Sequence, residues 1–177
     1  MIILFNRIKE KIARSYRIAY FKAFTKNKNK VNILGKITVI NPNVKVGKNV
    51  IIYPNVLLYG DGEIVLGDNV IIGQGTIIYA SKSAGVFIGD NTMIAAQCYI
   101  IDTDHGIQAN NLIRKQQNTI EKVVIENDCW LAAGCKVLKG SKINKGAVIG
   151  AQAVVKGEIP ENAIAVGMPA KVIKFRS

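Results

Sequence analysis

The sequence predicts an all-β fold, a solenoid of triangular cross-section preceded by a short amphipathic helix. Three observations predict it. An aliphatic residue returns every six positions over most of the chain, and turn formers such as "GKN", "YPN", "GDN" and "NKG" lie between these positions. A six-residue period does not match a helix or a long strand, but it fits short strands joined by sharp corners. Hydrophobic residues make up 49% of the chain and aromatic residues only 7%, so aliphatic side chains must fill the core, which is typical of stacked strands.

Residues 1–26 carry a helical pattern, in which apolar side chains share one face and basic side chains lie elsewhere. The apolar face comprises Phe5, Ile8, Ile12, Tyr16, Ala19 and Ala23. One interpretation is a cap that covers the open end of the solenoid, and the other is a basic helix resting on anionic lipid. The two interpretations are compatible. We therefore divide the chain into an N-terminal helix over residues 1–27 and a β-helix over residues 28–177.

The six-residue repeats group in threes, which gives coils of 18 residues. A small or β-branched residue follows most of the aliphatic positions after four residues, so each face of a coil contributes one large and one small side chain to the core. Stacked coils should lie about 4.8 Å apart, like neighbouring strands. The aliphatic positions are Val46, Ile52, Leu58, Leu66, Ile72, Ile78, Ile88, Ile94, Ile100, Ile125, Leu131, Val137, Ile143, Ile149 and Val155.

Three insertions interrupt the repeat, between positions 58 and 66, 78 and 88, and 100 and 125. Each follows the third hexad of its coil, so all three should leave from the same corner of the prism. Loops gathered at one corner of a solenoid usually build its functional surface. The longest insertion, at about residues 101–124, is too polar for a core and too long for an ordinary connection.

The three cysteines occupy the small position of the repeat and form no CxxC pair. We expect Cys98, Cys129 and Cys135 to be buried thiols, because an apolar environment suppresses the reactive thiolate. Neither a disulfide framework nor a metal site is expected.

The net charge of +12 is concentrated at the two ends, with +8 in residues 1–30 and +6 in residues 136–177. No apolar run is long enough to span a bilayer, and early charges argue against a secretory signal. We expect a cytoplasmic protein, with a peripheral position at the inner face of the membrane, through residues 1–26, as the further alternative. The basic C-terminal region favours a polyanionic ligand, and a solvated basic face is the alternative.

The single histidine of the chain, His105, lies in "IDTDHG" at the start of the longest insertion. An imidazole is suited to general-base catalysis at neutral pH. His105 is followed by "ENDCWLAAGCKVLKG", "VIGAQAVVKGEIP" and "GMPAKVIK", which carry a family resemblance. The chain resembles the left-handed parallel β-helix acyltransferases with hexapeptide repeats, most specifically the sugar and xenobiotic O-acetyltransferases over residues 87–175. The resemblance implies a left-handed coil, acetyl-CoA as co-substrate without a metal, and a homotrimer with active sites between neighbouring prisms.

The resemblance also implies roles for individual residues. His105 is expected to be the general base. One of the two flanking aspartates is expected to orient it or to bind acceptor hydroxyls, although either is equally explained as a turn residue. The motif favours Asp102 as the catalytic partner and leaves Asp104 at the acceptor site. The remaining implied positions are Trp130 at the acceptor site, the Ala133 backbone against the thioester, Ala151 and Lys156 on the pantetheine arm, and Lys171 and Lys174 on the nucleotide phosphates. Two positions depart from the family pattern. Lys156-Gly157 stands where many relatives have Thr-Lys, and Gly73 stands where galactoside- and maltose-type relatives have asparagine.

Three functions are compatible with these observations. The first is acetyl-CoA-dependent O-acetylation of a sugar hydroxyl in surface polysaccharide biosynthesis. The second is N-acetylation of a nucleotide-linked amino sugar on the same scaffold, and the third is a non-catalytic solenoid. A carbonic anhydrase of this fold needs three histidines on zinc, which the chain does not have. We expect a sugar or glycan as acceptor and no nucleic-acid partner.

Overall fold

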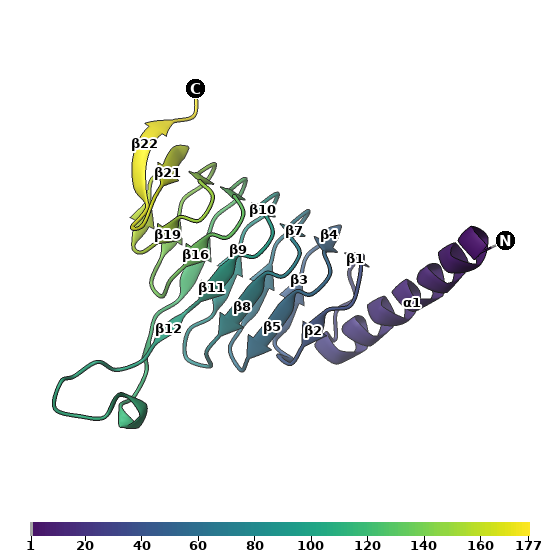
Figure 1. The fold of residues 1–177 in the computed structure, drawn as a ribbon, viewed down its shortest axis with the longest axis horizontal. Helices are drawn as coiled ribbons and strands as arrows, with labels where there is room; N and C mark the ends of the chain where they lie inside the picture. The colour runs from purple at the N-terminus through teal and green to yellow at the C-terminus, as the bar shows by residue number, and fades with distance from the viewer. Residues whose placement is uncertain (1) are drawn as a thin grey trace.

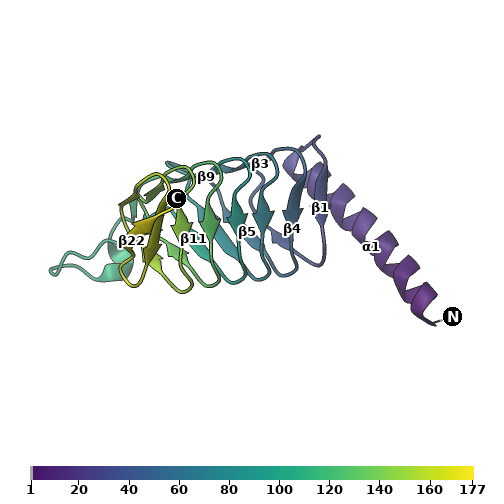
Figure 2. The same cartoon turned by 90° about the horizontal axis from the view of Figure 1, so that it is seen from above.

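The computed structural model describes residues 2–177, with side chains from Leu4 onward. Three parallel sheets form the faces of a triangular prism around which the chain winds, and this is the left-handed β-helix expected from the sequence (Figures 1 and 2). Sheet A contains β1 (Val31–Ile33), β4 (Val50–Ile52), β7 (Ile71–Ile72), β10 (Met93–Ile94), β15 (Trp130–Leu131), β18 (Val148–Ile149), β21 (Ala163–Val166) and β22 (Lys171–Phe175).

The other two faces contain six strands each. Sheet B contains β2 (Thr38–Val39), β5 (Leu57–Gly60), β8 (Ile77–Ala80), β11 (Tyr99–Ile101), β16 (Lys136–Val137) and β19 (Val154–Val155). Sheet C contains β3 (Val44–Val46), β6 (Ile64–Leu66), β9 (Val86–Ile88), β14 (Val123–Ile125), β17 (Lys142–Ile143) and β20 (Glu158–Ile159). All neighbours within these sheets are parallel except β21 and β22, which pair antiparallel at the C-terminal end.

The core consists of the side chains that the six-residue period predicts. The aliphatic positions from Val46 to Val155 are all buried, and so are the small positions that follow them, including the polar Thr76 and Ser141. The corner between sheets C and A repeats an asparagine in the left-handed backbone region, at φ of 57° to 58° for Asn49, Asn69 and Asn91. Asparagine tolerates this conformation well. These side chains also form a ladder, with Nδ2 to Oδ1 distances of 3.3 and 3.0 Å between successive coils.

The solenoid begins at β1, within the range predicted for it and before the first counted hexad at Val46. The structure adds β1 and β2 before Val46, with Ile33 buried and Val39 half-buried. The step from Val39 to Val46 is seven residues instead of six, so this first coil falls outside the regular six-residue count. The corner there contains the buried Asn41, whose side chain donates to the Gly62 carbonyl at 2.8 Å and accepts from the Asn43 N–H at 2.7 Å.

All three insertions leave from the corner between sheets B and C, as predicted. The two shorter ones connect β5 to β6 and β8 to β9, and the longest connects β11 to β14. This long loop contains β12 (Thr103–Asp104), a 3-10 turn η1 (Ile113–Lys115) and β13 (Thr119–Ile120), and it projects from the prism (Figure 1).

The helix α1 (Ile2–Thr25) contacts the prism only through its C-terminal part. Phe21 is buried, and Arg14 hydrogen-bonds the side chain of Asn32 on β1. The preceding turns extend away from the first coil (Figure 2). The cap interpretation therefore holds for the end of the helix, but not for the face that was expected to form it, because Phe5, Ile8, Ile12 and Tyr16 are exposed. Among residues 2–177, no helix combines the length and hydropathy needed to cross a bilayer.

Candidate active site

His105 lies at the root of the long loop, directly after a short antiparallel ladder. Thr103 pairs with Ile120 and Asp104 with Thr119, which anchors both ends of the loop at the corner between sheets B and C. Farther out, the Gln116 side chain ties the loop to itself. Its Nε2 donates to the carbonyls of Gln108 and Asn111 at 2.9 and 2.8 Å, and its Oε1 accepts from the Gln108 N–H at 2.7 Å. The exposed imidazole thus follows an ordered backbone while remaining open to a substrate.

Asp102 directly precedes this ladder and, unlike the exposed His105, is buried. The side chain is fully buried, and its carboxylate accepts from the Ser81 N–H, the Ser81 hydroxyl and the Gly85 N–H at 2.7 to 2.9 Å. These donors belong to the insertion of the preceding coil. These side-chain hydrogen bonds of Asp102 join two successive loops at one corner, and none of them involves His105. These contacts are those of a turn residue, and they differ from the contact with His105 that the catalytic role expected for Asp102 requires.

Asp104 lies beside His105 on the solvent side of the loop root. Its Oδ2 is 3.7 Å from the Lys139 Nζ, which comes from the corner of the next coil. An exposed pair at this distance contributes little to stability. It does place one acidic and one basic group at the loop root from which His105 follows.

Trp130 points outward from sheet A. The side chain is 47% exposed and stands in register with Met93 on β10 and Val148 on β18. It lines a shallow groove of about 430 Å³ together with Tyr53 and Ile71. Trp130 is therefore not a core residue, and its place at the acceptor site stays a prediction.

Gly73 forms part of the same groove. A Cβ atom at this position would lie 2.4 Å from the carbonyl carbon of Ala95 in the next coil. Because backbone atoms cannot move aside cheaply, an asparagine does not fit here. The departure from the galactoside- and maltose-type pattern is therefore built into the coil geometry.

Ala133 and Ala151 occupy successive coils at the corner between sheets A and B. Both are exposed, and the Ala133 carbonyl accepts from the Gln152 N–H at 2.9 Å. Among the described residues, neither alanine N–H donates to a backbone carbonyl. Each is therefore available to a ligand lying along this corner, which is the requirement for an oxyanion donor.

The predicted cofactor lysines lie near the C-terminal end of the prism. Lys171 and Lys174 are exposed on β22, opposite Val166 and Ile164 of β21, whereas the exposed Lys156 follows β19 at the corner between sheets B and C. Within residues 2–177 none of the three forms an ion pair. Positive charge is therefore open to an anionic ligand at this end.

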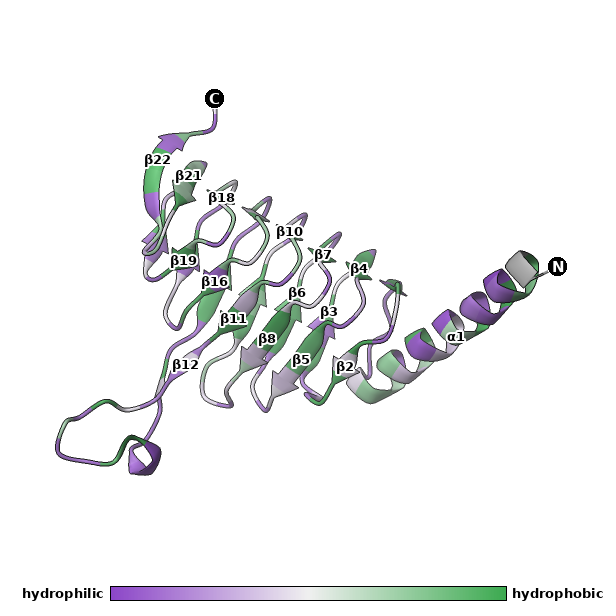
Figure 3. Cartoon of the chain, viewed as in Figure 1, coloured by the Kyte–Doolittle hydropathy of each residue, from purple (hydrophilic) through white to green (hydrophobic). Residues whose placement is uncertain are grey.

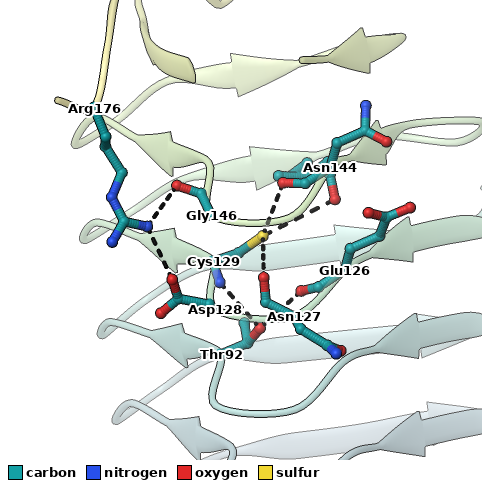
Figure 4. A network of polar contacts seen from close by, with 9 residues as sticks. Thr92, Glu126, Asn127, Asp128, Cys129, Asn144, Gly146 and Arg176 are labelled. Carbon is teal, nitrogen blue, oxygen red and sulfur yellow. Dashed lines mark hydrogen bonds and ion pairs between the residues drawn. The ribbon is translucent and has the colours of Figure 1, made fainter. Parts of the chain in front are cut away.

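Arg176 fixes the tail behind β22. Its Nη1 donates to the Gly146 carbonyl at 2.8 Å and lies 3.0 Å from the Asp128 carboxylate (Figure 4). This contact holds the strand with Lys171 and Lys174 against the body of the prism.

The cysteines are buried, as predicted. The Cys129 Sγ donates to the Asn144 carbonyl at 3.2 Å, while its N–H donates to Thr92 Oγ1 (Figure 4). Burial raises the pKa of the Cys129 thiol to about 11. A hydrogen bond with Cys98, together with burial, raises the pKa of the Cys135 thiol. In the described residues no three His, Cys, Asp or Glu side chains gather in a metal-binding arrangement.

The predicted site residues form two groups on different parts of one prism. Asp104 and His105 lie at the corner between sheets B and C. Trp130 lies on sheet A, and Ala133 lies at that sheet's border with sheet B. In a triangular prism each face is opposite the corner formed by the other two. A single chain therefore does not bring His105 and Trp130 together.

The comparisons with known proteins agree with this architecture. The family described as bacterial transferase hexapeptide (six repeats) matches residues 122–157. A probable acetyltransferase of Mycobacterium tuberculosis is 39% identical over 117 residues, which cover 66% of this chain. A putative lipopolysaccharide biosynthesis O-acetyl transferase of Escherichia coli is 32% identical over 123 residues, or 65% of this chain. Over these segments the chain is similar to hexapeptide-repeat acetyltransferases. The matches span 38% and 62% of the lengths of these two relatives.

Solved structures extend the likeness in fold. An N-acyltransferase from Bacillus cereus, in complex with dTDP and 3-hydroxybutyryl-CoA, has a TM-score of 0.82 at 22% identity, over 91% of this chain and 88% of its own. A maltose O-acetyltransferase from Clostridium difficile has a TM-score of 0.54 at 27% identity, over 80% of this chain and 71% of its own.

Several residues of the site were not found by sequence reasoning. Ser81 and Gly85 as partners of Asp102, and Lys139 beside Asp104, come from other coils and carry no local signal. The groove walls did carry a signal. Met93 directly precedes the buried Ile94, just as Trp130 precedes Leu131, so the repeat register alone places both side chains outside sheet A.

Proposed function

We propose that this protein transfers an acetyl group from acetyl-CoA to a sugar hydroxyl, in the synthesis of a surface polysaccharide. The observation that carries the proposal is the single histidine, held exposed at an ordered loop root in an acyltransferase scaffold. The relatives named as O-acetyltransferases support the same chemistry, and the E. coli relative is named for lipopolysaccharide biosynthesis.

The proposed mechanism needs one base and one hydrogen-bond donor. His105 takes the proton of the acceptor hydroxyl as its oxygen attacks the thioester carbonyl. The Ala133 N–H stabilises the negative oxygen of the tetrahedral intermediate. Collapse of the intermediate breaks the carbon–sulfur bond, and the departing CoA thiolate takes the proton from His105. The acetyl ester and free CoA are the products.

Acetyl-CoA is proposed to lie along the corner between sheets A and B. Ala151 meets the pantetheine arm there with its free N–H, and Lys171 and Lys174 meet the phosphates. Lys156, at another corner, reaches the pantetheine of a cofactor held by a neighbouring chain. The B. cereus enzyme, whose structure contains an acyl-CoA, supports the use of such a co-substrate on this fold.

The complete site is proposed to form between two copies of the chain in a homotrimer. This follows from the separation of His105 from Trp130 and Ala133 in one prism, because a loop that projects from one chain is free to approach sheet A of the next. Asp104 then lies on the acceptor side of the shared site, and Asp102 supports the loop root from within.

Subunit complementation tests the shared site. The variants His105→Ala and Trp130→Ala, each nearly inactive alone, are refolded together. If each site takes His105 from one chain and Trp130 from the next, random mixing restores about a quarter of the wild-type activity. A mixture that stays inactive, or a sedimentation experiment that gives a stable monomer, contradicts the shared site.

The reaction itself is tested with a panel of acceptors that includes simple sugars, nucleotide-linked amino sugars and lipid-linked glycans. Each is incubated with acetyl-CoA and protein, and the products are identified by mass spectrometry. Mild alkali then removes an ester but leaves an amide. An alkali-labile product supports O-acetylation, whereas a stable product on an amino sugar supports N-acetylation. An absence of acetylation across the panel, with no hydrolysis of acetyl-CoA, favours the non-catalytic solenoid.

A further inference from the structure

The projecting part of α1 carries a continuous apolar stripe. Its side chains recur at a spacing of three or four residues, which aligns them along one side of a helix. Each is at least half exposed, and hydrophobic and hydrophilic bands alternate along this part of the helix (Figure 3). The stripe consists of Leu4, Phe5, Ile8, Ile12 and Tyr16.

The solenoid does not cover this stripe. The helix touches the prism through Phe21, Thr25 and Arg14. At about 100° of rotation per residue, these positions lie on the side of the helix roughly opposite the stripe. The apolar surface is therefore not a loose part of the core, since the fold uses a different face for attachment.

Basic residues line both borders of the stripe. On a helical projection, Lys9 lies at one edge and Lys11 at the other. Glu10, the single acidic residue before Asp61, forms an ion pair with Arg17. The lysines thus face the surroundings of the stripe without a nearby acid, and the segment "KNKNK" adds further positive charge at residues 26–30.

We propose that α1 docks on an anionic lipid bilayer, with the apolar stripe in the boundary between headgroups and acyl chains. Lysine stems can follow the apolar surface while their ammonium groups contact lipid phosphates. The helix lies on the membrane and does not span it, in agreement with its hydropathy. A second copy is a poorer occupant, because pairing the stripes of two helices brings two sets of lysines together. This proposal does not depend on acetyl transfer.

Flotation of the full chain with vesicles tests the docking. The protein should float with vesicles that contain phosphatidylglycerol and stay at the bottom with pure phosphatidylcholine. Raising the salt concentration should weaken the binding, since it screens exposed charges. Equal binding to both vesicle types, or no flotation with either, overturns the proposal.

Matched variants separate the stripe from general surface effects. Ile12→Ser removes an apolar side chain that is 66% exposed, and Ile40→Ser removes one that is 64% exposed on the first coil. The first change should lower partitioning by about tenfold, and the second should leave it unchanged. Lys9→Gln with Lys11→Gln should also lower it by tenfold or more, unlike Lys48→Gln with Lys145→Gln at the corner between sheets C and A.

Circular dichroism and gel filtration establish that each variant is folded. Because all the altered side chains are exposed, we expect unchanged spectra and assembly sizes. If Ile12→Ser binds vesicles like the wild type, the stripe does not contact lipid and the proposal is wrong. If it reduces the size of the assembly and leaves vesicle binding unchanged, a second copy covers the stripe, which also overturns the proposal.

Discussion

Replacing Asp102 with alanine should destabilise the fold strongly, although the residue precedes the proposed general base by only three positions. The carboxylate is fully buried and accepts bonds from two backbone N–H groups and one hydroxyl. Alanine leaves the N–H groups of Ser81 and Gly85 without an acceptor, and each buried donor costs about 1–3 kcal/mol. The Ser81 hydroxyl can rotate and costs less. The free energy of unfolding should therefore fall by about 4 kcal/mol.

Asparagine at position 102 should be tolerated much better. Its oxygen can accept from both N–H groups, while its amide nitrogen donates to the Ser81 hydroxyl oxygen. The loss is then limited to the weaker bonds of a neutral acceptor, about 1 kcal/mol. Asp104→Asn is the matched control, because this neighbour has a single exposed ion pair at 3.7 Å. It should change stability by less than about 0.5 kcal/mol.

Thermal melting followed by circular dichroism, at one protein concentration, measures this order. For a chain of this size 1 kcal/mol corresponds to roughly 2–4 °C, so Asp102→Ala should melt about 8–16 °C below the wild type. Activity measured well below the melting temperature should survive in Asp102→Asn. If Asp102→Ala melts like the wild type, the structural reasoning is wrong. If Asp102→Asn is inactive but fully stable, the side chain acts in catalysis.

Two further predictions concern the cofactor and the thiols. Lys171→Ala with Lys174→Ala should weaken CoA binding by about tenfold in calorimetry. The variant should also bind CoA and CoA lacking its 3′-phosphate with the same affinity. If the wild type already binds both with the same affinity, the contact with the 3′-phosphate is contradicted. At pH 8 a thiol reagent should label Cys129 at least 100-fold more slowly than an ordinary cysteine. The reagent reacts with the thiolate, and a thiol with a pKa of about 11 is almost fully protonated at pH 8. All three cysteines should react after unfolding, and rapid labelling of the native protein contradicts the buried assignment.

The regular part of the solenoid was predictable from the sequence because each hexad repeats the same physical requirement. One large side chain and one small side chain per face must be buried, and the chain must turn sharply between faces. The first coil lies within the predicted β-helix, but the hexad count begins only at Val46, because the seven-residue step between Val39 and Val46 and the buried Asn41 break that pattern. A buried asparagine is read as a loop residue until its partner, the Gly62 carbonyl, is known.

The N-terminal helix shows a limit of periodicity. The apolar face of α1 was identified correctly, but a pattern on one helix does not reveal which side contacts the rest of the chain. Phe21 lies off that face and provides the buried contact. The stripe from Leu4 to Tyr16 is left exposed as a result.

The site was predictable as a set of residues but not as an assembly. The position of His105 at a loop root follows from counting hexads. The bonds of Asp102 to Ser81 and Gly85 do not, since they join insertions that are far apart in sequence. The roles of His105, Trp130 and Ala133 stay predictions.

Kinetics of His105→Ala test the central claim most directly. Removal of a general base should lower kcat by about 10²–10⁴-fold, while the affinity for CoA, measured by calorimetry, stays within about twofold because the CoA phosphates contact other residues. Ile107→Ala, in the same loop, is the control and should retain wild-type kcat. A His105→Ala variant that keeps most of its activity, or that loses CoA affinity in proportion to its rate, contradicts the assignment of His105 as the general base.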